Sequence, residues 1–416
     1  MIILFNFNTY LGGGETLFVR FISFLFKQEE PFHAYCKEGS FIAKQLKKEG
    51  LPDSVFTSIK SKSDYPYLSQ EERVSLLNEI DGFLPKSDKY YYLSFCLREL
   101  YMLIDLNKRH QGSISHLVLH NQDYLYLGRT IWDGVIEKLT KKKVFHNDKF
   151  LSFNKHIINL VNQQKGLIPM SWIISQLWKK EIAVDIPEDM IVSLPSFCDK
   201  NEVTLRSQNN KKIIFIGRLV DFKFASLFAI FNYIKRNPTY QLTVVGSGDK
   251  ERALKYISEN AIPLDNIHFA GEVAYTDLPK IISDHSIGYA AGTSIIECAQ
   301  QGLPVIMALQ NNANKPFHKD ICGGLFCNTT KGNLGEDLCL YSEDSIPITI
   351  DDTIKEIEAD YISATQRCFD YVRKEYSINL NFREYLCRIK NSAPIDTSKT
   401  KVPRTGGFRR FLYKKV

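Results

Sequence analysis

Short apolar runs alternate with amphipathic segments along most of this 416-residue chain. The first run covers residues 2–7 (IILFNF) and leads to an amphipathic segment at residues 16–26. Apolar runs of about four to eight residues are of strand length, whereas apolar residues repeating every three or four positions are typical of a helix packed on one face. Strands that alternate with helices pair in parallel, because each helix carries the chain back to the start of the next strand. The pattern therefore predicts parallel sheets covered by helices.

The alternation occurs in two series. In the first series the further strand candidates are HAYCK, SVFTSI, YYYLSF and HLVLHN, with a helical pattern at residues 41–49. Residues 190–212 interrupt the alternation with Pro, Ser, Asn and charged side chains. The second series contains KIIFIG, YQLTVVG, NIHFAGEV, HSIGYA, LPVIMAL and GGLFCN, with helical patterns at residues 222–235, 250–259, 276–282 and 294–301.

Two series in a chain of this length predict two doubly wound, Rossmann-like α/β domains in tandem, each with its own core. In open parallel sheets, ligands bind beyond the carboxyl ends of the strands, so the loops at those ends are the candidate sites. The predicted segments are an N-terminal domain at 1–192, a linker at 193–211, a C-terminal domain at 212–370, a helix at 371–391 that crosses back to the N-terminal domain, and a basic tail at 392–416.

The positive charge of the chain belongs to its C-terminal end. The net charge is +6, but residues 388–416 carry +8 and the rest of the chain carries −2. This balance argues against a nucleic-acid-binding body. The final stretch, GGFRRFLYKKV, interleaves aromatic side chains with cations, a composition that suits an anionic membrane surface. Residues 403–416 are therefore a candidate membrane contact, and a solvated tail is an equal alternative.

Cysteine usage indicates a reducing, cytoplasmic setting. The chain has nine cysteines and no C-x-x-C pair. Cys322 and Cys327 lie closest together in sequence, without the further ligands that a zinc site needs. The apolar stretch at residues 16–26 is interrupted by Arg20 and is too short to span a bilayer. No basic segment precedes the first apolar run, so a secretory signal is not expected.

The stretch IIFIGRLVDFK places two cations directly after a strand and at the entry to a helix. Gly217 and Arg218 follow the strand, and Lys223 lies at the start of the helix. Cations beside the free N–H groups of a helix end suit an anionic group such as a diphosphate. The alternative is a pair of solvated surface cations.

A second loop of this kind occurs in YAAGTSIIE. Gly292, Thr293 and Ser294 form a loop without bulky side chains that leads into a helix, so free N–H groups face outward. Glu297 has two interpretations. Ser294 to Glu297 fits the S-x-x-E capping box, in which the hydroxyl and the carboxylate satisfy N–H groups at a helix start. Alternatively, the carboxylate binds a ligand.

Two glycine-rich loops complete the set of candidates. In YLGGGETL, Gly12, Gly13 and Gly14 follow the first strand and permit close approach of a ligand to the backbone. This loop is neither a Walker loop nor a complete Rossmann fingerprint. In VVGSGDKE, Gly246 and Gly248 form a similarly incomplete motif, which we interpret as a plain turn.

Taken together, these motifs resemble those of the GT-B glycosyltransferases, in particular the family-four (glycosyl transferases group 1) retaining enzymes that use nucleotide sugars. GGGE resembles the GGxE loop of that family, and GRLVDFK resembles its G-R-L-x-x-x-K motif. IHFAGEVAYTDLPKII and GTSIIECAQQGLPVI are similar to its nucleotide-binding stretch. The resemblance is strongest at residues 212–308 and implies two Rossmann-like domains that face each other across a cleft.

The resemblance also implies roles for individual residues. Glu297 would accept hydrogen bonds from the donor ribose, while Arg218 and Lys223 would neutralise the departing diphosphate, as the chemistry of the bond cleavage requires. His120, near the end of the strand candidate HLVLHN, would face the donor sugar. Arg218, Lys223 and His120 are the candidate catalytic residues. The candidate donor-binding residues are Gly13, Gly14, Gly217, Arg218, Lys223, Gly271, Glu272, Gly292, Thr293, Ser294, Ile295 and Glu297.

Further polar residues near His120 are His116, Asn121 and Asp123. The sequence departs from the family pattern at one position. The first Glu of the E-x7-E pattern, which in the family touches the transferred sugar, would fall at Tyr289. No D-x-D motif occurs in the chain, which suits the metal-independent GT-B design, so neither a metal nor a cofactor is expected.

The leading hypothesis is a cytoplasmic, metal-independent, retaining glycosyltransferase. It would move a sugar from a nucleotide-sugar donor to a glycan or lipid-linked acceptor in bacterial surface polysaccharide biosynthesis, as a soluble or peripheral membrane protein. The alternatives are a GT-B-fold nucleotide-sugar epimerase, which needs no acceptor, and a non-catalytic nucleotide-sugar-binding subunit, which the replacement at Tyr289 favours.

Overall fold

The computed structural model of the chain describes residues 1–9, 12–60, 64–120, 148–195, 210–274, 276–310, 320–335 and 348–403. The chain divides into two compact units. Unit 1 comprises Met1–Val192 together with Phe382–Val416, and unit 2 comprises Ser193–Asn381. Each unit encloses a hydrophobic core of its own.

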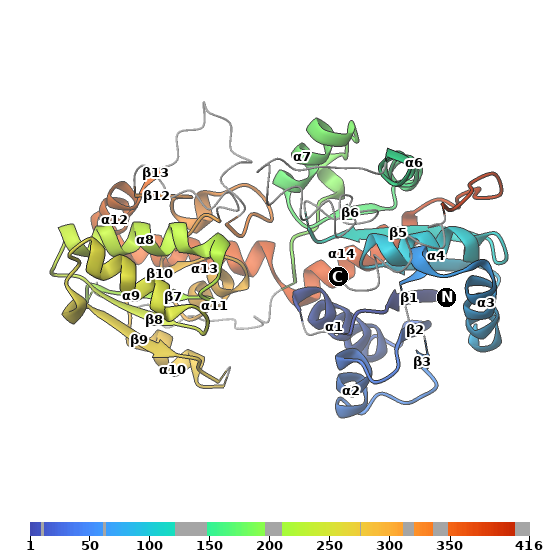
Figure 1. Cartoon of the computed structure of the whole chain (residues 1–416), viewed down its shortest axis with the longest axis horizontal. Coiled ribbons are helices and arrows are strands. Elements are labelled where there is room, and N and C mark those ends of the chain that lie inside the picture. The colour runs from blue at the N-terminus through green and yellow to red at the C-terminus, as the bar shows by residue number, and fades with distance from the viewer. Residues whose placement is uncertain are drawn as a thin grey trace. The chain divides into compact units, whose positions relative to one another are not determined.

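Unit 1 contains a six-stranded parallel sheet with the order β3-β2-β1-β4-β5-β6 (Figure 1). Its strands are β1 (Ile2–Asn6), β2 (Phe32–Lys37), β3 (Phe56–Ile59), β4 (Tyr90–Ser94), β5 (Gly112–Val118) and β6 (Leu167–Pro169). All five residues of β1 are buried, because β1 lies in the middle of the sheet with both faces covered. The direction in which strands are added reverses between β1 and β4, and the crevice at such a switch point is where ligands bind in these sheets.

The helices of unit 1 are α1 (Gly13–Lys27), α2 (Phe41–Lys48), α3 (Gln70–Phe83), α4 (Leu97–Asn107), α6 (Asp148–Gln163) and α7 (Trp172–Ile182), with the 3₁₀ turns η1 (Tyr65–Tyr67) and η3 (Glu188–Met190). Helix α1 starts three residues earlier than the apolar pattern at 16–26 predicts. Gly13 and Gly14, predicted as loop, therefore form the first turn of α1, where backbone N–H groups have no partner within the helix.

Unit 2 contains a five-stranded parallel sheet with the order β11-β10-β7-β8-β9. Its strands are β7 (Lys212–Ile216), β8 (Gln241–Val245), β9 (Ile267–Gly271), β10 (Ile287–Ala290) and β11 (Val305–Met307). An antiparallel pair, β12 (Ile321–Cys322) and β13 (Ile348–Thr349), lies outside this sheet. The switch point falls between β7 and β10. The prediction of two doubly wound parallel sheets is confirmed.

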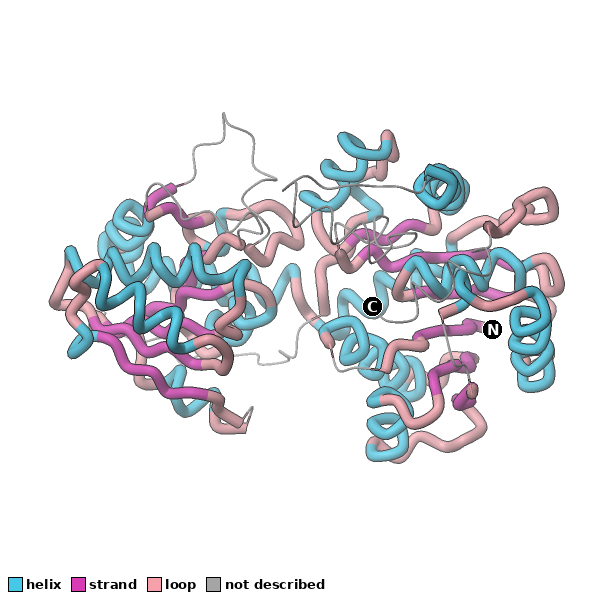
Figure 2. Tube along the Cα trace, viewed as in Figure 1, coloured by secondary structure: helices cyan, strands magenta, loops and turns pink. Residues whose placement is uncertain are grey.

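The helices of unit 2 are α8 (Asp221–Arg236), α9 (Lys250–Glu259), α10 (Leu278–Ser283), α11 (Thr293–Gln300), α12 (Ile350–Ala359) and α13 (Tyr361–Glu375), with the 3₁₀ turns η4 (Leu264–Asn266) and η5 (Phe326–Asn328). They cover both faces of the sheet (Figure 2). On β10, Tyr289 contacts Ser226 of α8, whereas Gly288 packs against Cys298 of α11. Since successive strand residues point to opposite faces, α8 and α11 lie on opposite sides of the sheet.

The last described segment returns the chain to unit 1. Helix α14 (Ile378–Asn391) begins in unit 2 and continues into unit 1, where Phe382 packs against Phe21 and Phe24 of α1. The sequence predicts one helix at 371–391. In the structure this range holds the end of α13, which stops at Glu375, and the whole of α14, which begins at Ile378.

The segment after α14 differs from the predicted tail at 392–416. Pro394 bridges to Ser113 of β5, and the carbonyl of Ile395 accepts a hydrogen bond from Asn107 Nδ2 at 2.7 Å. The carbonyl of Pro403 accepts one from Arg73 Nη2 at 3.0 Å. Residues 392–403 thus pack on unit 1, and the basic residues 404–416 lie outside the described residues. Within the described part, no helix combines the length and apolar character that crossing a membrane requires.

Candidate functional site

The predicted residues of unit 2 lie at the carboxyl edge of its sheet, beside the switch point. Gly217 and Arg218 directly follow β7, the central strand, and Gly292 precedes α11 after the neighbouring strand β10. Gly271 ends β9 at the edge of the same sheet, followed by the exposed Glu272. Strands β7 and β10 pair directly, with Ile216 opposite Ala290 at their carboxyl ends. The fold therefore brings the two predicted loops next to each other.

Lys223 and Arg218 form a pair of cations at this edge. The Lys223 ammonium lies over Gly217, where a Cβ atom would stand 2.9 Å from Lys223 Nζ. Burial, together with the nearby Arg218 guanidinium, lowers the pKa of Lys223 to about 8. Neither side chain forms a hydrogen bond or ion pair with another described residue. The acid in the first turn of α8, Asp221, pairs instead with Arg252 of α9 at 2.6 Å.

Lys223 is half-buried, and an ammonium that is partly removed from water without a carboxylate partner is destabilising unless an anion joins it. Lys223 is therefore unlike a solvated surface lysine, while Arg218 is exposed and free to reach toward a ligand. Functional sites are where such perturbed groups gather. The geometry fits an anion with two or more charged oxygens, such as a diphosphate.

The start of α11 decides between the two interpretations of Glu297. The helix begins at Thr293 with Gly292 at the N-cap, at a φ of +74°, and no side chain caps it. Ser294 is thus the second residue of the helix rather than its cap, so the capping-box interpretation is wrong. Glu297 lies half-buried on the first turns of α11.

The N–H groups at this helix start are partly used by the chain itself. The N–H of Gly292 donates to the carbonyl of Leu334 at 2.6 Å, and the N–H of Ile295 donates to the carbonyl of Gly292 at 3.1 Å. Within the described residues, the N–H groups of Thr293 and Ser294 have no backbone partner. These two groups are the ones that a ligand at the start of α11 could use.

Tyr289 is a core residue. Its side chain is fully buried in β10, its hydroxyl donates to the carbonyl of Ser226 at 3.1 Å, and its ring lies 6.2 Å from that of Phe215. Burial raises the pKa of this phenol well above its usual range. Tyr289 therefore packs α8 onto the sheet and does not reach the carboxyl edge where the cations lie.

The sequence predicts a plain turn at Gly246 and Gly248, but in the structure both glycines also contact a neighbouring loop. Both have positive φ, +143° and +134°, and both lie against the loop that carries Arg218. Sequence alone does not show this contact, because it joins loops nearly 30 residues apart, although two glycines in a loop after a strand are a signal of close backbone approach.

In unit 1, the predicted residues lie at the carboxyl ends of β1 and β5. A Cβ atom on Gly14 would stand 3.3 Å from Leu119 Cδ1, so the start of α1 adjoins the end of β5. His120 follows Leu119 and is exposed. His116 is buried inside β5, with Nδ1 2.9 Å from Ser94 Oγ. Asn121 and Asp123 lie outside the described residues.

A polar network that the sequence analysis missed holds the loop after β1. Asn8 accepts from Arg98 Nη2 at 2.9 Å and donates to Glu15 Oε1 at 2.6 Å. The buried carboxylate of Glu99 accepts from the N–H groups of Phe7 at 3.0 Å and of Cys96 at 2.9 Å. Burial raises the pKa of Glu99 to about 7. This network fixes the entry to the glycine-rich start of α1.

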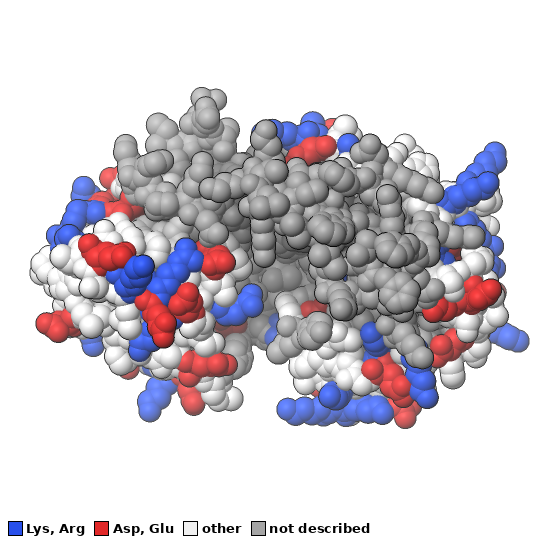
Figure 3. Space-filling model, viewed as in Figure 1, with Lys and Arg blue, Asp and Glu red and all other residues white. Residues whose placement is uncertain are grey.

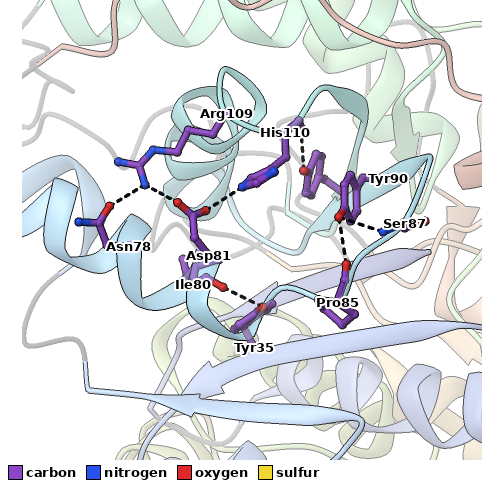
Figure 4. A network of polar contacts seen from close by, with 10 residues as sticks. Tyr35, Asn78, Ile80, Asp81, Pro85, Ser87, Tyr90, Arg109 and His110 are labelled. Carbon is purple, nitrogen blue, oxygen red and sulfur yellow. Dashed lines mark hydrogen bonds and ion pairs between the residues drawn. The ribbon is translucent and has the colours of Figure 1, made fainter.

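A second network of unit 1 lies at the opposite, amino edge of the sheet (Figure 4). Asp81 accepts from Arg109 Nη1 at 2.6 Å and lies 3.0 Å from His110 Nε2. Tyr90, the first residue of β4, donates its hydroxyl proton to the carbonyl of Pro85 at 3.0 Å. Because ligands bind at the carboxyl edge of such sheets, we interpret this cluster as a structural one.

Residues 199–331 match the family model of the glycosyl transferases group 1, and this range includes Arg218, Lys223 and the start of α11. The fold is GT-B, and the part of unit 2 that carries these cations is similar to the glycosyl transferases group 1. The resemblance inferred from the motifs is confirmed.

Relatives of this GT-B chain include the O-antigen biosynthesis glycosyltransferase WbnH of Escherichia coli, which is 30% identical over 193 residues, 44% of this chain and 54% of that protein. The match spans about half the length of this relative.

Two solved structures share the fold over nearly their whole length. A glycosyltransferase from Rickettsia africae has a TM-score of 0.59 at 14% identity, covering 96% of this chain and 99% of that one. Anabaena Alr3699/HepE, solved in complex with UDP, has a TM-score of 0.59 at 10% identity, covering 94% and 99%. At these identities, the likeness is one of fold.

Proposed function

We propose that this chain is a retaining glycosyltransferase that moves a sugar from a nucleotide-sugar donor to a glycan or lipid-linked glycan acceptor. The observation that carries the proposal is the Arg218–Lys223 cation pair at the switch point of a group 1 domain, with no acidic partner among the described residues. Its relative WbnH is named for O-antigen biosynthesis, which supports a role in bacterial surface polysaccharide assembly. We propose that the chain acts on the cytoplasmic side of the membrane.

Cleavage of the bond between sugar and diphosphate leaves positive charge on the sugar and additional negative charge on the diphosphate. Arg218 and Lys223 would stabilise that negative charge more strongly as it grows, which lowers the barrier. The ammonium of Lys223 is held against Gly217 before the ligand arrives, so little reorganisation is required. We propose that these cations stabilise the departing diphosphate without a metal ion or a cofactor.

The other predicted residues have supporting roles in the proposal. The carboxylate of Glu297 would accept hydrogen bonds from the ribose, and the N–H groups of Thr293 and Ser294 would meet the diphosphate at the start of α11. Gly13 and Gly14 at the start of α1, and the exposed His120 after β5, are kept as candidate sugar-binding residues in this proposal.

The experiment is incubation of the protein with UDP-, GDP-, ADP- and CMP-linked sugars, with and without a lipid-linked oligosaccharide, followed by NMR. We expect transfer or slow hydrolysis of one donor, with the anomeric configuration kept, in the presence of a chelator. Inversion of the configuration would contradict the retaining mechanism, and loss of activity with the chelator would contradict metal independence.

A second candidate function is a nucleotide-sugar-binding subunit without turnover. The observation that favours it is Tyr289, which occupies the position where the family pattern has a Glu and whose hydroxyl is committed to the carbonyl of Ser226. Tight binding of a nucleotide sugar with neither hydrolysis nor transfer over long incubation would favour this candidate over the first.

A further inference from the structure

Three loops meet at the carboxyl edge of unit 2, and two glycines make their contact possible. The loop after β7 carries Gly217, Arg218 and Leu219, the loop after β8 carries Gly246 to Asp249, and the third begins at Gly271, the last residue of β9. The N–H of Gly246 donates to the carbonyl of Gly271 at 2.8 Å, which joins the second and third loops.

The first and second loops continue the pairing of their strands. The N–H of Gly217 donates to the carbonyl of Val245 at 2.9 Å, the N–H of Leu219 to the carbonyl of Ser247 at 2.8 Å, and the N–H of Asp249 to the carbonyl of Leu219 at 3.0 Å. Leu219 and Gly248 form a parallel bridge. Arg218 therefore stands between two residues whose backbones are held by the end of β8 and by the loop after it.

This contact leaves no room for a side chain. A Cβ atom on Gly246 would stand 2.0 Å from the carbonyl oxygen of Gly217, and one on Gly248 would stand 2.3 Å from the carbonyl oxygen of Leu219. Both neighbours are backbone atoms, so a rotamer change cannot relieve the overlap. The φ values of +143° and +134° also disfavour any residue other than glycine.

We propose that Gly246 and Gly248 are positioning residues that act on the donor through Arg218 and Lys223. By letting the loop after β8 lie flush with the loop after β7, they fix the backbone from which the Arg218 guanidinium extends and the Gly217 surface on which the Lys223 ammonium rests. Charged groups stabilise a developing charge more strongly when they are held in place beforehand, because no reorganisation is then required. This inference rests on the proposed function, since it concerns the same anion site.

The test measures UDP affinity by calorimetry for the full chain and its Gly248→Ala and Gly246→Ala variants. We expect each variant to bind UDP at least tenfold more weakly than the wild type. The matched control is Gly39→Ala, because Gly39 also has positive φ (+71°) but nothing lies within 4 Å of its Cβ position, in unit 1. Gly39→Ala should bind UDP within twofold of the wild type.

A double-mutant cycle separates positioning from a general loss of structure. If Gly248 acts through the cations, Gly248→Ala should change UDP affinity by less than twofold in a variant that already carries Arg218→Ala and Lys223→Ala. An equal fold-loss in both backgrounds would overturn the inference, as would unchanged affinity of Gly248→Ala in the wild-type background.

If the alanine variants fail to fold, hydrogen exchange on the wild type still tests the contact between the loops after β7 and β8. The amides of Leu219 and Asp249 should exchange slowly, because each donates across the contact between the loops. Exchange at the rate of an unprotected amide would overturn the inference. Failure of the proposed function shows itself differently: the wild type would then bind none of the nucleoside diphosphates, while the exchange measurement would still test the loop contact.

Discussion

At the scale of single residues, Lys223 determines how the proposed site responds to pH. Its pKa in the free protein is lowered to about 8 by burial and by Arg218. Below this value the ammonium is charged and attracts the diphosphate, and above it the amine is neutral and the attraction is lost. We therefore expect UDP affinity, measured by calorimetry from pH 7 to pH 9.5, to fall as the pH passes about 8.

The variant Lys223→Arg is the matched control for this pH dependence, because a guanidinium stays charged throughout the range. Its UDP affinity should vary little between pH 7 and pH 9.5, whatever its absolute value. A wild-type profile as flat as that of Lys223→Arg would contradict the role assigned to Lys223.

Tyr289 gives a second prediction at this scale. Tyr289→Phe removes the hydrogen bond to the buried carbonyl of Ser226 and keeps the packing of the ring. We expect the free energy of unfolding, measured by urea denaturation, to fall by about 1 kcal/mol, the usual net value of such a bond. Affinity for the nucleotide sugar should stay within twofold. A tenfold loss of affinity at unchanged stability would show that Tyr289 meets the ligand.

At the scale of elements, the sequence predicts more of the fold than of the site. Of the six strand candidates in the second series, five are the strands of the unit 2 sheet, and the helical pattern at 250–259 coincides with α9. The sixth, GGLFCN, is wrong, because its last three residues, Phe326–Asn328, form the 3₁₀ turn η5. The five strands and α9 follow from local periodicity. The start of α11 does not, because Ser294 and Glu297 have the spacing of a capping box, whereas the backbone at Gly292 begins the helix one residue before Ser294.

Features that depend on contacts between distant residues escape the sequence pattern. The segment at 392–403 packs on unit 1 through carbonyl groups that accept from Arg73 and Asn107, and through the buried side chains of Ile395 and Val402. These two apolar residues stand seven positions apart among polar ones, so they form no periodic pattern in the sequence. The network around Glu99 likewise joins the loops after β1 and β4 through backbone N–H groups. Arg218 and Lys223 could be predicted because both lie within one short motif.

The packing of α14 on α1 gives a prediction at this scale. Phe382 is buried, with its ring centroid 5.2 Å from that of Phe21 and 5.3 Å from that of Phe24. Phe382→Ala should lower the free energy of unfolding of unit 1 by about 3–5 kcal/mol, as measured by urea denaturation. In the same helix Leu380 is 56% exposed, and Leu380→Ala should change stability by less than about 0.5 kcal/mol. Equal effects of the two substitutions would contradict the packing.

At the scale of the whole molecule, the charge of the chain is divided between a nearly neutral body and a basic C-terminal end. Residues 388–416 carry +8, while the rest of the chain carries −2. On the face of unit 2 that Figure 3 shows, Lys and Arg side chains are interspersed with Asp and Glu. This distribution supports the proposal that the tail, rather than the body, contacts an anionic membrane.

Deletion of residues 404–416 tests that proposal while leaving the carbonyl of Pro403, which accepts from Arg73, in place. We expect the truncated protein to co-sediment less with vesicles that contain anionic lipid, and the difference to shrink at high salt, because salt screens the attraction. Neutral vesicles are the control. Equal sedimentation of the two proteins with anionic vesicles at low salt would show that residues 404–416 do not contact the membrane.

The most direct measurement for the account as a whole is UDP binding by Lys223→Ala and Arg218→Ala. The matched control is Lys250→Ala, since Lys250 starts α9 after the neighbouring strand β8 but lies exposed over Phe269. We predict that removing either member of the Arg218–Lys223 pair weakens UDP binding at least tenfold, while Lys250→Ala binds within twofold of the wild type. Wild-type affinity in both Lys223→Ala and Arg218→Ala would contradict the assignment of the diphosphate site.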